Sequence, residues 1–213
     1  MTSPGTLSGR AVLYGVPTTI STPYGPYDEI IEAGALRAAL SDERITVVRE
    51  HDPGRLLGRV SSGTLELRDT TFGLDVRVVL PGTELGRETL ELVQRGDLAG
   101  MSFAFSGAED EWHDPAQRGA RPTRVITGVR RLFDVSVVTW PAYERTRVSV
   151  QRDGESASRD RAQLERYYRR VRALAAYTGL GTRHDARLGP RCRSLPPVAR
   201  WTRRHRHMVR IGK

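Results

Sequence analysis

Short runs of apolar and β-branched residues, separated by turn residues, are the feature that most constrains how this chain can fold. Such runs are typical of strands, because alternate residues of a strand share one face of a sheet. They occur at residues 11–16, 45–48, 56–60, 64–67, 74–80, 98–105, 124–129 and 132–140. Because strands and helices do not alternate regularly, the pattern predicts an antiparallel or mixed, barrel-like α+β domain.

Two stretches have helical spacing instead. In residues 28–40, apolar side chains recur on one side and Asp28 can cap the first turn, although Gly34 interrupts the pattern. Residues 85–93 also carry an apolar side, and the glycine that follows at position 96 is a residue that commonly ends helices. Together with the strands, these helices place the predicted domain at residues 9–150.

Charge is distributed unevenly along the chain. Residues 151–213 hold 17 Lys and Arg against 5 Asp and Glu, whereas residues 1–150 hold 17 against 20. We expect a linker and a short amphipathic helix at residues 151–178, followed by a basic, flexible tail at residues 179–213. Such a tail can meet DNA or an acidic protein surface, so nucleic-acid binding stays open.

Composition excludes several classes of protein and site. No apolar run is long enough to span a membrane, and the N-terminal residues do not resemble a secretory signal. The single cysteine, Cys192, leaves no internal disulfide and no cysteine-based metal cluster. His205 and His207 lie in the basic run rather than in a cluster of ligands. Neither a metal nor another cofactor is therefore expected.

Two candidate residues suit acid–base chemistry. His51 follows the predicted strand 45–48 and begins a turn, where an imidazole can be partly held and partly exposed. Asp134 lies within an apolar strand, where a carboxylate must be paired, and orienting a histidine is one such role. The alternatives are an ordinary turn histidine, and an aspartate that pairs with Arg130 or Arg131.

The candidate nucleophile is Ser102. In a strand, Ser102 shares one face with Gly100 and Ala104, while Met101 and Phe103 point to the opposite face and toward the core. Small neighbours leave the clearance that a substrate backbone needs to approach a hydroxyl. The alternative is an ordinary strand serine beside a glycine.

Five segments follow one another along the chain: residues 27–36, 51–60, 73–81, 95–105 and 134–143. In this order they resemble the prohead protease family of tailed bacteriophages, which are capsid maturation proteases. The resemblance covers about residues 9–150. Each segment is weak alone, and the order of all five makes the resemblance specific.

The resemblance implies a fold like that of the herpesvirus capsid protease, which is an α+β fold with a mostly antiparallel β-barrel and surrounding helices. It also implies cleavage of peptide bonds by a serine nucleophile. The family's serine corresponds to Ser102 in a Gly-Met-Ser-Phe segment, and its histidine to His51 in a His-Asp segment. The third member corresponds to Asp134, in the segment where an acidic residue precedes Val and Ser. His113 also follows Ser102, but it lies in a polar loop, so Asp134 is preferred.

The resemblance also implies partners and a place of action. The expected substrates are the major capsid protein and the scaffold protein, with the chain itself as a further one, and a homo-oligomer and contact with the portal are compatible with it. The expected place is the assembling prohead in the host bacterial cytoplasm. Two other classes stay open: a non-catalytic capsid assembly or scaffold-associated protein, and a nucleic-acid-binding module that uses the basic tail.

Overall fold

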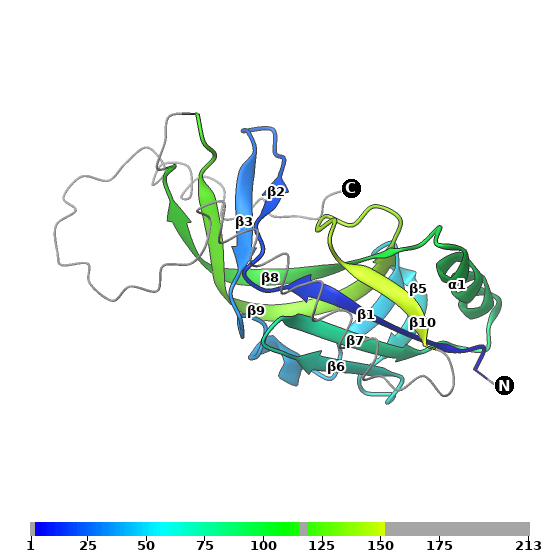
Figure 1. Cartoon of the computed structure of the whole chain (residues 1–213). Coiled ribbons are helices and arrows are strands. Elements are labelled where there is room, and N and C mark those ends of the chain that lie inside the picture. The colour runs from blue at the N-terminus through cyan, green and yellow to red at the C-terminus, as the bar shows by residue number, and fades with distance from the viewer. Residues whose placement is uncertain (1–2, 116–118, 152–213) are drawn as a thin grey trace.

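The computed structural model describes residues 3–115 and 119–151 of the chain (Figure 1). In chain order the elements are β1 (Thr6–Leu13), β2 (Thr18–Ile20), β3 (Tyr27–Ile31), the 3₁₀ helix η1 (Ala39–Ser41), β4 (Thr46–Arg49), β5 (Asp52–Arg59), β6 (Leu65–Asp69), β7 (Gly73–Val79), α1 (Glu84–Arg95), β8 (Gly100–His113), β9 (Thr123–Val138) and β10 (Arg147–Gln151). The predicted α+β class is confirmed, with strands in the majority. Helices do not surround the sheets, because α1 is the one α-helix in this part of the chain.

The strands form two sheets. One has the order β10-β1-β7-β6, and the other has the order β2-β3-β9-β4-β5, with β8 bonded to the other edge of β9. Strands β3 and β4 run parallel to β9, and the remaining pairings are antiparallel. Within the described residues the two sheets bond to one another only locally, through a bridge between Tyr14 and Ile31 and a hydrogen bond from Val148 N–H to the carbonyl of Ala99. The sheets do not close into a barrel, so the predicted β-barrel is not confirmed. The likeness to the herpesvirus protease stays a prediction.

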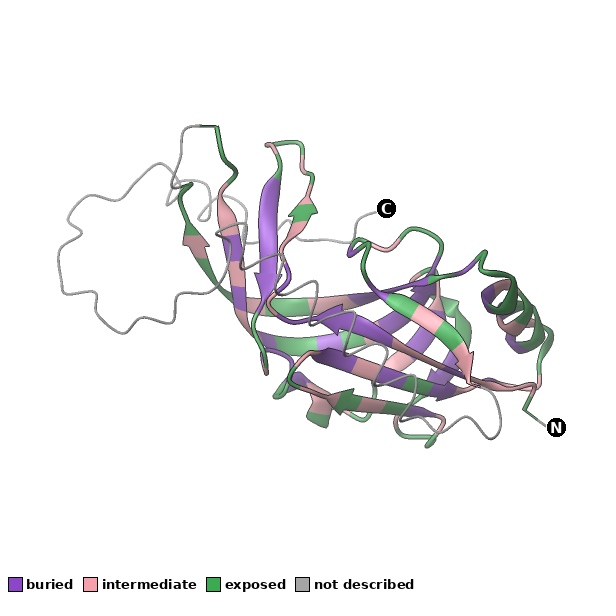
Figure 2. Cartoon of the chain, in the orientation of Figure 1, coloured by how far each residue is buried: buried purple, intermediate pink, exposed green. Residues whose placement is uncertain are grey.

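One hydrophobic core lies between the two sheets, as the band of buried residues in Figure 2 shows. It takes Val76 and Val78 from β7 in one sheet, and Val47 and Val135 from β4 and β9 in the other. Helix α1 adds Val93 at one end. Each large aliphatic side chain removed from water stabilises the fold by about 1.5–3 kcal/mol, so this core is the main source of stability for the framework on which β8 and β9 rest.

Residues 28–40 are not a helix, contrary to the prediction from their apolar spacing. Strand β3, Tyr27–Ile31, bonds to β2 on one side and to β9 on the other. All five of its side chains are buried, the acidic Asp28 and Glu29 included. In the sequence, Asp28 and Glu29 look like solvent-exposed residues of a helix, because no basic partner is close by. Arg124, which pairs with Glu29 in the fold, lies 95 residues further along the chain.

Strands β8 and β9 form one antiparallel hairpin that is longer than predicted. Residues 108–113, which include the polar loop predicted around His113, continue β8. The two strands predicted at 124–129 and 132–140 are one strand, β9. The pairing register shifts twice along the hairpin, and such bulges bend a strand without ending it. Strands β2 and β10 were not predicted, and β1 begins five residues before the predicted strand 11–16, whereas β4 to β7 and α1 match the predicted elements within a few residues.

A buried ionic cluster joins β3, β8, β9 and the segment after β9. Arg124, 6% exposed, donates from Nη1 to Glu29 Oε2 at 2.8 Å and from Nε to Asp110 Oδ2 at 2.5 Å. The hydroxyls of Tyr143 and Tyr27 donate to the same Glu29 carboxylate. Because a desolvated charge is costly without partners, this cluster fixes the position of β3 against β9.

The free energy of unfolding is expected to fall as the pH rises above about 10. Burial and then the charge of Glu29 raise the pKa of Tyr27 to about 12 and hold the pKa of Tyr143 well above its usual value. The unfolded chain ionises these tyrosines near pH 10, while the folded chain keeps their protons. Their contribution to stability is therefore complete below pH 10 and is lost as the pH rises toward the folded-state values.

Urea unfolding at a series of pH values from neutral to about 11 measures this slope. The double variant Tyr27→Phe/Tyr143→Phe should give a flatter profile. Some slope should remain, because burial also raises the pKa of Tyr14. A double variant whose stability falls as steeply as that of the wild type would contradict the assignment.

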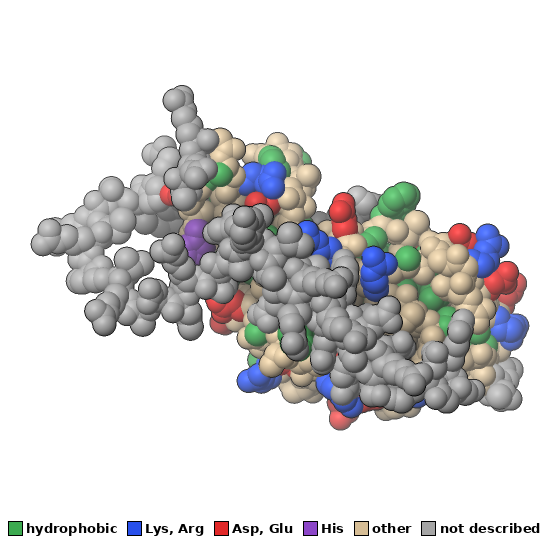
Figure 3. Space-filling model, viewed as in Figure 1, with side chains coloured by type: hydrophobic (Ala, Val, Ile, Leu, Met, Phe, Trp, Pro, Cys, Tyr) green, Lys and Arg blue, Asp and Glu red, His purple; other side chains and the backbone are tan. Residues whose placement is uncertain are grey.

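The predicted amphipathic helix in 151–178 and the tail at 179–213 fall outside the described residues, apart from Gln151. On the face shown in Figure 3, the basic and acidic side chains that are described are interspersed and do not gather into one basic surface. None of the helices in the described part of the chain is long and apolar enough to cross a membrane.

Candidate active site

Strand β9 brings the candidate residues together, because β8 lies along one of its edges and β4 along the other. Ser102 of β8 pairs with Ser136 of β9, and Val48 of β4 lies on the other side of Ser136. Directly paired residues point to the same face of a sheet, and so do residues two apart on one strand. Ser102, Ser136 and Asp134 therefore share one face.

His51 reaches this face from a tight turn after β4. Arg49 of β4 pairs with Asp52 of β5, which leaves Glu50 and His51 as a two-residue hairpin loop. Both loop residues have positive φ, 57° and 54°, as the central residues of a type I′ turn do. For residues other than glycine this conformation costs about 1–3 kcal/mol each, and such strain clusters at functional sites. The predicted turn at 51–54 is thus displaced, since β5 begins at Asp52.

The turn is held in place by the side chain of Glu50. Its carboxylate accepts two hydrogen bonds from Thr139, one from the backbone N–H and one from Oγ1, each 2.7 Å long. The backbone N–H of Glu50 also donates to the carbonyl of Val137 at 3.0 Å. These three bonds fix the strained loop against the end of β9, and with it the position of His51.

His51 and Asp134 are in direct contact. The Nδ1 atom of His51 lies 2.8 Å from Asp134 Oδ1, and both side chains are largely but not fully buried. Of the arginines considered as alternative partners, Arg131 lies near Asp42 and over the ring of Phe133 instead. The structure therefore brings together two of the three residues that the sequence singled out.

A second hydroxyl, which the sequence analysis missed, completes this contact. Ser136 is fully buried, and its Oγ donates to Asp134 Oδ1 at 2.6 Å and lies 3.1 Å from His51 Nδ1. The two-residue spacing between Asp134 and Ser136 could have placed them on one strand face. No local sequence pattern predicts that His51 contacts Asp134 and Ser136, which lie more than 80 residues further along the chain.

These contacts determine which ring nitrogen of His51 is free. Asp134 can only accept at Nδ1, and Ser136, whose proton goes to Asp134, also presents an acceptor there. With two acceptors facing it, Nδ1 carries the proton in the neutral imidazole. The lone pair is then on Nε2, which is the nitrogen available to take a proton from another group.

Ser102 lies opposite Ser136 on the neighbouring strand. Its flanking residues Met101 and Phe103 point into the core, in agreement with the predicted division of faces. Ser102 is only 7% exposed, so the clearance expected around it is small. Its Oγ makes no hydrogen bond within the described part of the chain.

His113 is not part of this arrangement. It ends β8 opposite Thr123 and has Glu111 3.9 Å away. It lies eleven positions after Ser102 on the same strand, a distance of roughly 35 Å along an extended strand. Among residues 3–115 and 119–151, no group of three or more His, Cys, Asp or Glu side chains is arranged to hold a metal ion.

Comparison with known proteins agrees with the class of site. The sequence model of the family described as caudovirus prohead serine protease matches residues 2–160. This range covers both sheets and every residue of the arrangement around His51. No curated protein and no solved structure matches the chain significantly.

Proposed function

The chain belongs to the caudovirus prohead serine protease family, and we propose that Ser102, His51 and Asp134 perform the peptide-bond cleavage. Ser102 is the nucleophile, His51 is its general base, and Asp134 orients the imidazole. Family membership supports a serine peptidase of capsid maturation. The three roles rest on the geometry of this chain.

One observation carries the proposal: His51 Nδ1 is occupied by Asp134 and Ser136, while Ser102 lies on the same sheet face and its hydroxyl makes no hydrogen bond to any described residue. A serine nucleophile needs a base whose free nitrogen can reach it and whose other nitrogen is held by an acceptor. Ser136 is less suited to attack, because it is fully buried and its proton is donated to Asp134.

The reaction then follows the course of acyl transfer. Nε2 of His51 takes the Ser102 proton as Oγ attacks the carbonyl carbon of the scissile bond. The C–N bond breaks when His51 returns that proton to the leaving amine. Water, deprotonated by His51, attacks the resulting ester and releases the carboxylate product and Ser102. Asp134 accepts the Nδ1 hydrogen bond throughout and offsets the charge of the imidazolium.

The proposed substrates are the major capsid protein and the scaffold protein of the same virus, and the chain itself is a further candidate. Cleavage is proposed to take place inside the assembling prohead in the host cytoplasm. Membership of a family of prohead proteases supports this place and these substrates.

A serine-directed fluorophosphonate probe tests the assignment of the nucleophile. The purified full-length chain is incubated with the probe, digested, and analysed by mass spectrometry for the modified residue. We expect the label on Ser102 and its loss in the His51→Ala variant, because the base is then absent. A label on Ser136 would show that the nucleophile is Ser136 of β9 and not Ser102. A chain that takes no label would favour the non-catalytic assembly role.

The variant Ser136→Ala is expected to lower kcat by about tenfold with KM unchanged, since a hydroxyl that fixes Asp134 and His51 contributes about one hydrogen bond to the transition state. Probe labelling of Ser102 should persist at a reduced rate. The measurement is steady-state cleavage of a peptide beside the labelling rate. Inactivation as complete as that of the Ser102→Ala variant would give Ser136 a catalytic role instead of a positioning one.

A further inference from the structure

Trp140 is the most exposed of the large hydrophobic side chains in the described part of the chain, at 87%. Tryptophan is a mostly buried residue type in folded proteins. A single exposed apolar side chain needs no explanation by itself. The backbone on both sides of Trp140, however, is held against the two elements that carry His51 and Ser102.

On the N-terminal side, the contact is with the turn that holds His51. Thr139 precedes Trp140 and donates both its backbone N–H and its Oγ1 to the carboxylate of Glu50, each at 2.7 Å. Glu50 immediately precedes His51 and is the other central residue of the hairpin loop. Trp140 is thus one residue from a bond to the loop that presents the base.

On the C-terminal side, the contact is with the strand of Ser102. Pro141 follows Trp140 and packs on Gly100, where a Cβ atom would lie 2.5 Å from Pro141 Cγ. Gly100 and Ser102 are two residues apart on β8, with no register shift between them, so they share a face. Pro141 therefore lies on the Ser102 face and immediately beside it.

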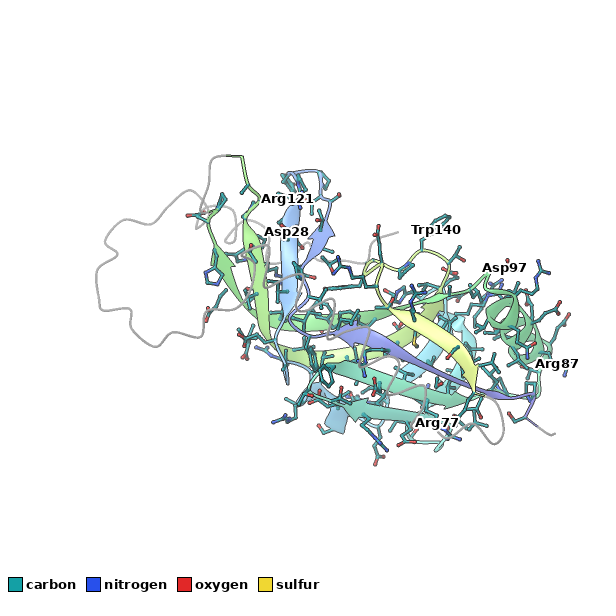
Figure 4. The ribbon with its side chains drawn as sticks, viewed as in Figure 1. Asp28, Arg77, Arg87, Asp97, Arg121 and Trp140 are labelled. Carbon is teal, nitrogen blue, oxygen red and sulfur yellow. The ribbon has the colours of Figure 1, made fainter. Side chains whose placement is uncertain are left out.

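These two contacts give Trp140 a fixed backbone position close to the site. Trp140 lies four positions after Ser136, so their Cα atoms are no more than roughly 14 Å apart. Figure 4 shows Trp140 on the loop between β9 and β10, away from Asp28 and Arg121. An extended substrate bound at Ser102 covers the same distance with about four residues.

We propose that Trp140 forms a binding subsite for an apolar side chain of the substrate, within about four residues of the scissile bond. The indole presents a large rigid apolar surface, and covering it with an aliphatic or aromatic side chain removes both from water. The subsite rests on the proposed function, because it has a role only if Ser102 cleaves a polypeptide. It selects the sequence that is cut and takes no part in the chemical step.

The test uses a mixture of peptides from a digested bacterial proteome as substrate. The full-length wild type and the Trp140→Ala and Trp140→Phe variants are compared by mass spectrometry of the new termini. We expect wild-type sites to be enriched in apolar residues at one position within about four residues of the cut. This enrichment should be lost in Trp140→Ala and kept in Trp140→Phe.

Kinetics with the best-cleaved peptide separate binding from chemistry. For Trp140→Ala, KM should rise about tenfold with kcat nearly unchanged, as expected when a contact equally strong in the ground and transition states is removed. The matched control is Tyr24→Ala. Tyr24 is also an exposed aromatic residue, at 60%, but it lies between β2 and β3, beside the opposite end of β9.

The fluorophosphonate probe distinguishes the two ways in which the idea can fail. A fluorophosphonate with only short alkyl groups is used, so that it reacts at Ser102 without an extended chain that could reach Trp140, and wild type and Trp140→Ala should be labelled at equal rates. Equal labelling with an unchanged cleavage profile would overturn the subsite alone. Labelling without cleavage of any peptide would overturn the proposed peptide-bond cleavage, and the subsite with it. A wild-type chain that is neither labelled nor active would overturn the proposed function, and the subsite with it.

Discussion

Replacing Ser102 by alanine is expected to abolish cleavage of the major capsid protein when the two proteins are produced together. Removal of the nucleophile of a serine peptidase lowers kcat by a factor on the order of 10⁶, which leaves no detectable processing on a gel. The fold should survive, because the Ser102 hydroxyl makes no hydrogen bond in the described residues and alanine fits the same position. Processing is followed by electrophoresis, and folding by the urea unfolding curve.

Ser106→Ala is the matched control for this variant. Ser106 lies on the same strand, opposite Arg131, and is exposed. Its substitution should leave both processing and stability unchanged. Wild-type rates of processing in the Ser102→Ala variant would remove Ser102 from the reaction. Processing lost together with the folded state would instead show that the serine is structural, and labelling by the probe would then decide which serine reacts.

Replacing Arg124 by methionine is expected to have the largest effect on stability. Arg124 pairs with Glu29 and Asp110, and its guanidinium lies 6.0 Å from the centre of the Trp112 ring. Glu29 is 4% exposed, so loss of the arginine leaves a buried carboxylate without its counter-charge. Breaking a buried pair in this way lowers the free energy of unfolding by about 3–5 kcal/mol. Urea unfolding at neutral pH measures the change.

Two further variants show whether the buried charge is the cause. Arg121→Met removes a half-exposed arginine from Asp28 in the same region, and it should cost less than about 1 kcal/mol because the pair is screened by solvent. The double variant Glu29→Gln/Arg124→Met should recover part of the lost stability, because the uncompensated charge is then gone. Equal losses in the Arg121 and Arg124 variants would show that burial of the pair is not what matters.

Local pattern was sufficient for elements whose partners are close in sequence. The residues of β6 and β7 follow one another and alternate clearly, and α1 carries its own end signals in Thr83 and Gly96. The strand from Gly100 onward was also correctly divided into a core face and a small-residue face, because alternation depends only on the strand itself. The order of five short segments was sufficient to identify the family.

Local pattern failed where the partners are distant. Residues 28–40 have helical spacing, but they begin with a strand in which Asp28 and Glu29 are buried. Both carboxylates pair with arginines that lie more than 90 residues away in the sequence. Charged residues after Phe105 predicted a loop, whereas pairing with β9 continues the strand to His113. In both cases, hydrogen bonds and ion pairs across the sheets outweigh weak local preferences.

For the candidate site, the sequence by itself determined the residue types and the strand face on which the serine stands. Only the tertiary structure decided that Ser136 shares Asp134 with His51, and that Trp140 stands at the edge of the same arrangement. The reason is physical. Alternation along one strand is a property of neighbouring residues, whereas the contacts around His51 depend on how β4, β8 and β9 are paired, and that pairing is fixed by the packing of both sheets around their common core.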